Sequence, residues 1–148
     1  MTGLLRSVTA SLASSVVERL TDENVQDIVD TAASGGITYW AIEPSARELA
    51  GMPDDCQYVI VEGEDDRLFG FGGHRQVEEV HYLSRDQIRQ AYAKVLDPAQ
   101  GYANREYHGY VAQSWIDRTG GGIDTSMIDA GTADILVQVA CFGEIRYG

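Results

Sequence analysis

Patterns typical of β-strands are confined to one central part of this sequence, residues 37–83, and helical patterns flank it on both sides. Strands and helices that are grouped in this way, instead of alternating, are typical of an α+β fold with an antiparallel sheet. The chain has 148 residues, which suits one domain. It contains no internal repeat and no long linker. The sequence therefore predicts a single α+β domain over residues 1–148, with a small antiparallel sheet packed against several helices.

The clearest helical pattern covers residues 21–36. Thr21 is a good N-cap, acidic residues follow it, and Gly35-Gly36 is a stop signal. Apolar residues recur between them with the spacing of one buried helical face: Val25, Ile28, Val29, Ala32 and Ala33. A preceding helix is expected to end near Leu20.

The central part predicts strands. Residues 37–42 are rich in β-branched and aromatic residues and end before Pro44, which indicates a short strand. Residues 58–62 and 67–71 flank an acidic turn and predict a hairpin. Residues 76–83 are a candidate third strand whose alternation is broken at Glu78-Glu79.

Three helices are expected after the strands. Ser84 and Gln87 have the spacing of a capping box, and this helix should run to Leu96. A second is expected over residues 104–116. Asp129 or Thr132 should cap a third, which runs to Phe142 and is apolar nearly all round, as expected for the centre of the core.

The charge of the chain excludes one class of partner. Eleven basic and twenty-three acidic residues give a formal net charge of −12. Direct nucleic-acid binding is not expected, because affinity for a phosphate backbone comes mainly from Lys and Arg. No apolar stretch approaches the roughly 20 residues that cross a bilayer, and Ser and Thr interrupt any secretory signal, so no membrane association and a cytoplasmic location in a host cell are expected. The acidity itself fits a salt-loving host, or a surface that resembles a polyanion.

Groups that could carry catalysis are sparse. Glu79 and His81 lie on the same face of a predicted strand, so they could be a general base and its orienting partner, or a solvated charge pair. Gly70–Gly73, with His74 and Arg75, could bind an anion or could be an ordinary bulge or strand exit. Histidine spacings match no zinc motif, and no catalytic residue, metal or cofactor is expected. Cys56 and Cys141 are expected to be reduced, with a disulfide as the alternative.

Aromatic residues give the best candidates for binding. Tyr and Arg can stack on planar groups and also form hydrogen bonds, which lets a few residues supply much of the energy of a pocket or interface. The alternative is that the aromatic rings belong to the core of a small domain. The candidate residues for binding a ligand or partner are Tyr39, Trp40, Arg105, Tyr107, His108 and Tyr110.

Two stretches resemble a known group of proteins. Residues 32–41 contain a GG-x-x-YW segment, and residues 128–148 contain DA-x-x-AD, then Gln138 and FGE-x-x-YG. They resemble small proteins of bacteriophages, archaeal viruses and plasmids, for which no activity is established. The resemblance covers about a third of the chain. It implies an origin in a mobile element and one compact domain whose ends pack together.

The sequence therefore predicts a small non-enzymatic accessory protein of a virus or mobile element. It would bind a host protein or sequester a small-molecule ligand, and countering host defence is the role expected for it. One alternative is an acidic mimic of nucleic acid that inhibits a DNA-binding enzyme. Another is a hydrolase or nucleotide-processing enzyme that uses Glu79 and His81, or His108. A homo-oligomer is also expected, because small binding proteins often pair through two-fold contacts.

Overall fold

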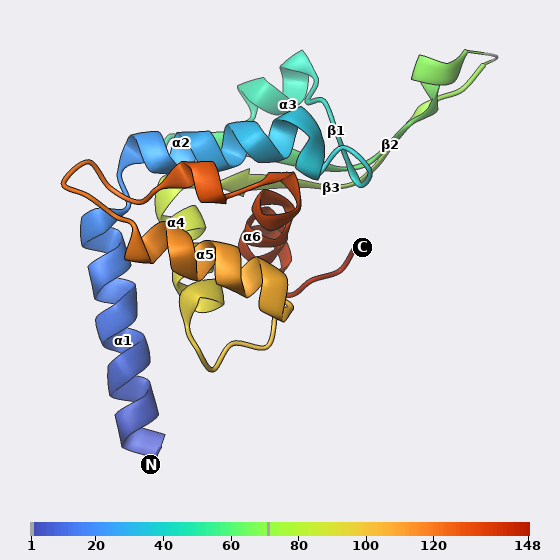
Figure 1. Ribbon diagram of the computed structural model, residues 1–148. Coiled ribbons are helices and arrows are strands. Elements are labelled where there is room, and N and C mark those ends of the chain that lie inside the picture. The colour runs from blue at the N-terminus through green and yellow to red at the C-terminus, as the bar shows by residue number, and fades with distance from the viewer. Residues whose placement is uncertain (1, 71) are drawn as a thin grey trace.

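The protein folds as a small single-domain α+β structure (Figure 1). The computed structural model describes residues 2–70 and 72–148. Within these residues the helices are α1 (Thr2–Arg19), α2 (Asp22–Thr31), α3 (Ala46–Ala50), α4 (Arg85–Leu96), α5 (Arg105–Ile116) and α6 (Ala130–Phe142). The strands are β1 (Ala41–Ile42), β2 (Tyr58–Asp65) and β3 (Arg75–Leu83). They form an antiparallel sheet in the order β1-β2-β3, which confirms the predicted fold class.

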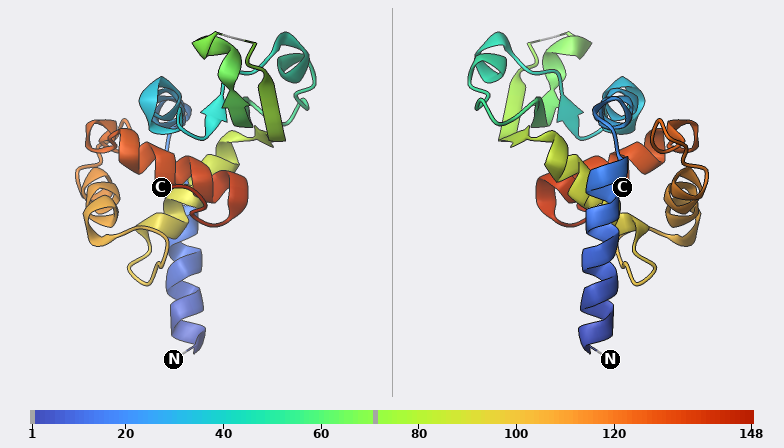
Figure 2. Two further views of the ribbon diagram at one scale, coloured as in Figure 1. Left: turned by 90° about the vertical axis from the view of Figure 1, so that its right-hand side faces the viewer. Right: turned by 90° about the vertical axis from the view of Figure 1, so that its left-hand side faces the viewer.

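Helix α6 lies at the centre of the molecule. It packs against α2, α4, α5 and β3 (Figure 2), and its residues 132–139 are all buried. As Figure 1 shows, α1 extends from this body at one end, and the β2–β3 hairpin extends from another. The buried position of α6 confirms the prediction made from its apolar sequence. None of the helices in residues 2–70 and 72–148 combines the length and apolar character that crossing a bilayer requires.

Helix boundaries follow the capping signals closely. Thr21, Ser84 and Asn104 each accept a hydrogen bond from a backbone N–H in the first turn of the helix that follows. Asp129, not Thr132, caps α6, and Gly143 ends it with φ of 69°, a left-handed conformation that favours glycine. Helix α3 was not predicted, although Ser45 and Glu48 form the same kind of capping box.

The predicted strand over residues 37–42 is wrong except for its last two residues. Residues 32–36 form a π-helical turn, η1 (Ala32–Gly36), in place of a regular helix end. The N–H groups of Trp40 and Ala41 then both donate to the Ile37 carbonyl, so the chain turns here. Of residues 37–42, only Ala41 and Ile42 form the ladder with β2, and the Trp40 carbonyl accepts one further hydrogen bond from the Gly63 N–H.

The predicted partner strand of the hairpin is also wrong. Residues 66–69 form a 3₁₀ turn, η2 (Asp66–Phe69), because the Asp65 side chain caps it. The chain returns as β3, so the predicted third strand is the true partner of β2. The register shifts between Glu62 and Gly63, opposite Glu78 and Glu79, which is a β-bulge at the point where the sequence alternation breaks.

Candidate functional site

A buried carboxylate joins the two stretches that carry the family resemblance. Asp134, on α6, is only 8% exposed. It accepts hydrogen bonds from the Tyr39 hydroxyl at 2.6 Å, the Trp40 indole N–H at 2.8 Å and the Gln138 amide at 2.9 Å. These three donors compensate for its burial. Asp134 therefore fixes the turn after η1 against α6.

Gln138 holds the C-terminal segment on the same helix. Its side chain is completely buried. Its Oε1 atom accepts from the backbone N–H groups of Arg146 and Tyr147, at 2.8 and 2.9 Å, and its Nε2 atom donates to the Tyr147 carbonyl at 3.1 Å. One amide thus pairs with the backbone of residues 146–147 as a neighbouring strand would.

Tyr147 connects this segment to the sheet. Its ring stacks on Trp40, with centroids 5.5 Å apart and planes 3° apart, and also packs against Phe142. Its hydroxyl donates to Glu62 of β2. This hydrogen bond to Glu62 is the main reason that the pKa of Tyr147 is raised, and burial adds to it.

The resulting arrangement encloses a pocket of about 590 Å³. We call it the tyrosine pocket, because four tyrosines from three parts of the chain line it, together with Asp134, Asn104 and small or aliphatic residues. The tyrosines are Tyr39, Tyr102, Tyr107 and Tyr147. Burial, the hydrogen bond to Asp134 and the charge of Asp134 raise the pKa of Tyr39 to about 12. The volume is within the range of pockets that hold small ligands.

Two of the six predicted binding residues, Tyr39 and Tyr107, line the tyrosine pocket. Trp40 is buried behind it against Asp134 and Tyr147. The other three lie elsewhere. Tyr110 donates to Glu106 on the exposed side of α5, the His108 ring lies 3.2 Å from the Leu96 carbonyl, and Arg105 is exposed.

The remaining pocket residues were not predicted as site residues. Tyr102 precedes α5 and belongs to the aromatic run from which the candidates were taken. Asp134, Gln138 and Tyr147 belong to the C-terminal motif. The resemblance implies that the two ends of the chain pack together, and the fold shows which residues of this motif contact the GG-x-x-YW segment. Gly36 carries part of that contact, because a Cβ atom on it would lie 2.3 Å from the Ala130 carbonyl oxygen.

A second polar cluster lies on the sheet. Glu62 and Glu79 are cross-strand partners, and His81 follows two residues later on the same face. The Nε2 atom of His81 lies 3.1 Å from Glu62 Oε1 and 3.8 Å from Glu79 Oε2. Burial opposes ionisation of Glu62, but hydrogen bonds from Tyr147 and His81 and the charges of His81 and Arg146 lower its pKa overall. The expected Glu79–His81 pair is thus part of a cluster of three residues. The third is the buried carboxylate of Glu62, which sequence spacing does not indicate.

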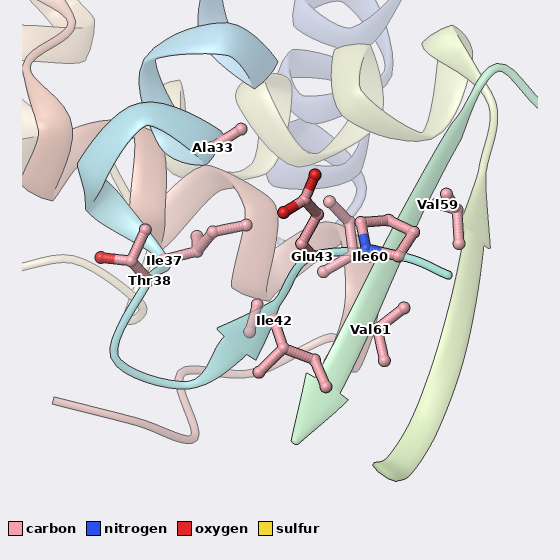
Figure 3. A pocket seen from close by; sticks show the side chains of 10 residues that line it. Ala33, Ile37, Thr38, Ile42, Glu43, Val59, Ile60 and Val61 are labelled. Atoms are coloured by element: carbon pink, nitrogen blue, oxygen red, sulfur yellow. The ribbon is translucent and has the colours of Figure 1, made fainter. Parts of the chain in front are cut away.

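An apolar pocket of about 430 Å³ lies on another part of the sheet (Figure 3). Ala33 and Ile37 border it from the η1 side, Ile42 from β1, and Val59 and Val61 from β2. None of the six predicted binding residues lines it. Its carboxylate, Glu43, is exposed.

Arg75 is not available to bind an anion at the glycine-rich loop, because its guanidinium already has partners. The guanidinium of Arg75 forms an ion pair with Glu48 of α3 and also donates to the Glu43 carbonyl. Gly70 and Gly72 have φ of 78° and 74°, as expected for glycines in a turn at the hairpin tip. These contacts favour the structural interpretation of the loop. Both cysteines, Cys56 and Cys141, are free thiols.

Comparison with known proteins adds no relative: no family model matches the chain, and neither the curated proteins nor the solved structures contain a match.

Proposed function

We propose that the protein is a small non-enzymatic binding protein of a virus or mobile element, and that the tyrosine pocket sequesters a small planar ligand. The observation that carries this proposal is the convergence of four tyrosines from three parts of the chain on one pocket of about 590 Å³. Aromatic rings supply stacking surfaces, and tyrosine hydroxyls supply hydrogen bonds at the rim. The viral setting rests on the resemblance of residues 32–41 and 128–148.

The composition of the pocket wall favours binding over catalysis. Its lining residues include no His, Cys, Lys or Arg, and Asp134 is its one carboxylate. That carboxylate already accepts three hydrogen bonds, so it is poorly placed to act as a nucleophile or general base. The wall also has no cation for an anionic ligand. We infer a neutral or cationic aromatic ligand, such as a nucleobase or an aromatic amine.

The acidic-mimic alternative has less support. Exposed Asp and Glu side chains occur on α1, α2, the β2–β3 hairpin, α4, α5 and the C-terminal segment. A mimic of a nucleic-acid backbone needs its charges along one stripe, whereas these elements lie on different sides of the molecule (Figure 2). The spread of charge is the ordinary condition of an acidic surface.

The test is ligand capture with a matched pair of variants. Native mass spectrometry of the purified protein, followed by titration with nucleosides and aromatic amines monitored by Trp fluorescence, should reveal one ligand per chain. Tyr107→Ala should weaken binding at least about tenfold, because stacking on one aromatic ring is worth about 1–3 kcal/mol. Tyr110→Ala, one turn further along α5 and outside the pocket lining, removes only an edge contact with the Tyr107 ring and should weaken binding much less than Tyr107→Ala.

Two outcomes would contradict the proposal. One is that neither the copurified material nor the panel yields a bound aromatic compound. The other is that Tyr107→Ala and Tyr110→Ala weaken binding equally, which would place the ligand outside the tyrosine pocket.

A further inference from the structure

We propose that Glu62, Glu79 and His81 form a binding site for a divalent transition-metal ion. None of these three residues lines the tyrosine pocket, although Tyr147, which does line it, donates to Glu62, and the inference goes beyond the proposed ligand binding. Each residue offers one ligand atom, and the three atoms all lie within 4.8 Å of one another. Two adjacent strands supply them, and Glu62 and Glu79 are the last cross-strand pair before the bulge that shifts the register.

The observed spacing is close to that of a bound state. Ligand atoms about 2.0–2.2 Å from a tetrahedral Zn²⁺ lie about 3.3 Å apart. The His81 Nε2 atom is 3.1 Å from Glu62 Oε1 and 3.8 Å from Glu79 Oε2. Closing the remaining gap requires movement of the Glu79 carboxylate, whose side chain is 65% exposed and free to rotate. Glu62 and His81 are already held in the sheet.

The charges around His81 also favour a cation. A single ring nitrogen faces two carboxylate oxygens, and its one N–H can donate fully to only one of them. A metal ion at this point would contact both oxygens and take the nitrogen lone pair of the neutral imidazole. It would also replace the histidine–carboxylate hydrogen bond with stronger coordination.

The second oxygen of Glu62 has its own partners, which leaves Oε1 available. Glu62 Oε2 accepts from the Tyr147 hydroxyl and lies 3.6 Å from the Arg146 guanidinium. Such outer contacts orient a ligating carboxylate without occupying the metal-facing atom. The Arg146 side chain is 43% exposed, so it can move towards Glu144 when a metal ion neutralises Glu62.

The donor set indicates the class of ion. One imidazole and two carboxylates suit Zn²⁺, Fe²⁺ or Mn²⁺, whereas Mg²⁺ and Ca²⁺ prefer oxygen ligands alone. Water would fill the open positions. Sequence spacing alone does not indicate this site, because one of its three ligands, Glu62, comes from a different strand than Glu79 and His81.

The experiment uses the full chain, stripped with a chelator and titrated with ZnCl₂ by calorimetry, with MgCl₂ in parallel and zinc content measured by mass spectrometry. We expect one Zn²⁺ per chain, no comparable Mg²⁺ binding, and a rise in melting temperature with Zn²⁺. Glu79→Gln should weaken Zn²⁺ binding at least about tenfold, since even partners outside the coordination shell are worth 10–100-fold.

Glu78→Gln is the matched control. It removes the same charge from the neighbouring position of β3, and Glu78 is not among the three clustered residues. Its Zn²⁺ affinity should stay within about twofold of the parent protein. Because both side chains are exposed, both variants should fold normally.

His81→Gln should abolish binding, and circular dichroism will show whether it folds. The proposal is overturned if the parent protein binds no stoichiometric Zn²⁺. It is also overturned if Glu79→Gln and Glu78→Gln behave alike, or if a folded His81→Gln variant keeps full affinity, because His74 or His108 would then be holding the ion. None of these outcomes depends on whether the tyrosine pocket binds a ligand.

Discussion

Substitution of Asp134 should lower the stability of the fold, because this carboxylate accepts three hydrogen bonds. Two come from side chains in the turn after η1 and one from its own helix. Asp134→Ala leaves the buried Trp40 N–H without an acceptor, and we expect a cost of about 3 kcal/mol in the free energy of unfolding. Asp134→Asn keeps an acceptor oxygen for Trp40 and Gln138 and should cost much less. Urea unfolding measures both.

The control for this pair is Asp54→Ala, which removes an exposed loop carboxylate. It should change stability by less than about 0.5 kcal/mol. An Asp134→Ala variant as stable as this control would show that the carboxylate does not hold the turn.

The two cysteines should differ in reactivity. Burial, with the charges of Glu62 and Glu79, raises the pKa of Cys141 to about 12, so almost no thiolate exists at pH 8. Cys56 has a raised pKa as well, through desolvation and Asp55, but its thiol is in a loop. Ellman's reagent at pH 8 should therefore modify Cys56 slowly in the native protein and Cys141 only after unfolding.

Cys56→Ser tests this assignment directly. Native protein carrying this substitution should show no reaction until denaturant is added. Rapid reaction of native Cys56→Ser would mean that Cys141 is accessible.

At the scale of elements, the contact between η1 and α6 can be tested with adjacent glycines. A Cβ atom on Gly36 would meet the Ala130 carbonyl oxygen at 2.3 Å, whereas one on Gly35 would meet nothing within 4 Å. Gly36→Ala should destabilise the protein by about 2 kcal/mol, because it forces η1 away from α6. Gly35→Ala should be neutral or slightly stabilising, because it restricts the unfolded chain.

Thermal or urea unfolding of the two variants gives the comparison. Equal effects at the two positions would mean that η1 does not pack closely on α6.

The link between α3 and the hairpin should depend on pH. The Arg75 guanidinium is the main cause that lowers the pKa of Glu48 to about 2, against the effect of burial. A carboxyl group with a lowered pKa stabilises the fold above its unfolded value, about 4.5, and this contribution is lost as pH falls towards 2. Stability should therefore decrease across this interval.

Glu48→Gln isolates this contribution, because glutamine can still complete the capping box with Ser45. The variant should be less stable than the parent protein by about 1 kcal/mol at pH 7 and nearly equal to it at pH 2. Urea unfolding of both proteins at the two pH values measures this difference in stability. The same difference at both would exclude the ion pair as its source.

The success of sequence-based prediction also differed from element to element. Helix ends were predictable where a side chain marks them, as at Ser84 and Asn104, because capping is a local interaction. The predicted strand over residues 37–42 is wrong because its conformation depends on a residue distant in sequence. Tyr39 and Trp40 both donate hydrogen bonds to Asp134, and the backbone has to turn to bring both side chains to that carboxylate. Local β propensity is too weak to oppose such a contact.

At the scale of the whole molecule, the hairpin tip is a projection from the body (Figure 1). Phe69 at the tip is 80% exposed. Replacing residues 67–73 with Asn-Gly would close the hairpin just beyond the hydrogen bond from Asp66 N to His74 O. Stability should change by less than about 1 kcal/mol, because a shorter loop costs little and those residues of the segment whose burial the structure describes lie outside the core.

Calorimetric melting of the shortened protein checks this prediction. A loss of several kcal/mol would mean that the tip supports the body.

The candidate site was only partly predictable, because it depends on how distant segments of the chain come together in the whole molecule. Tyr39 and Tyr107 were predicted from their aromatic neighbourhoods, but the pocket exists because residues about 100 positions apart meet at α6. The Glu62–His81 pair likewise needed the register of β2 against β3, which a bulge shifts by one residue. A single sequence offers composition and spacing, and neither specifies the pairing of distant segments.

The position of Gly148 has a practical consequence for handling the protein. This residue lines the tyrosine pocket, and its Cα region lies close to the Tyr39 hydroxyl. A purification handle fused there would crowd the entrance and compete with whatever binds, so an empty preparation could be an artefact of cloning. A handle placed ahead of α1, at the far end of the molecule, avoids this interference (Figure 1).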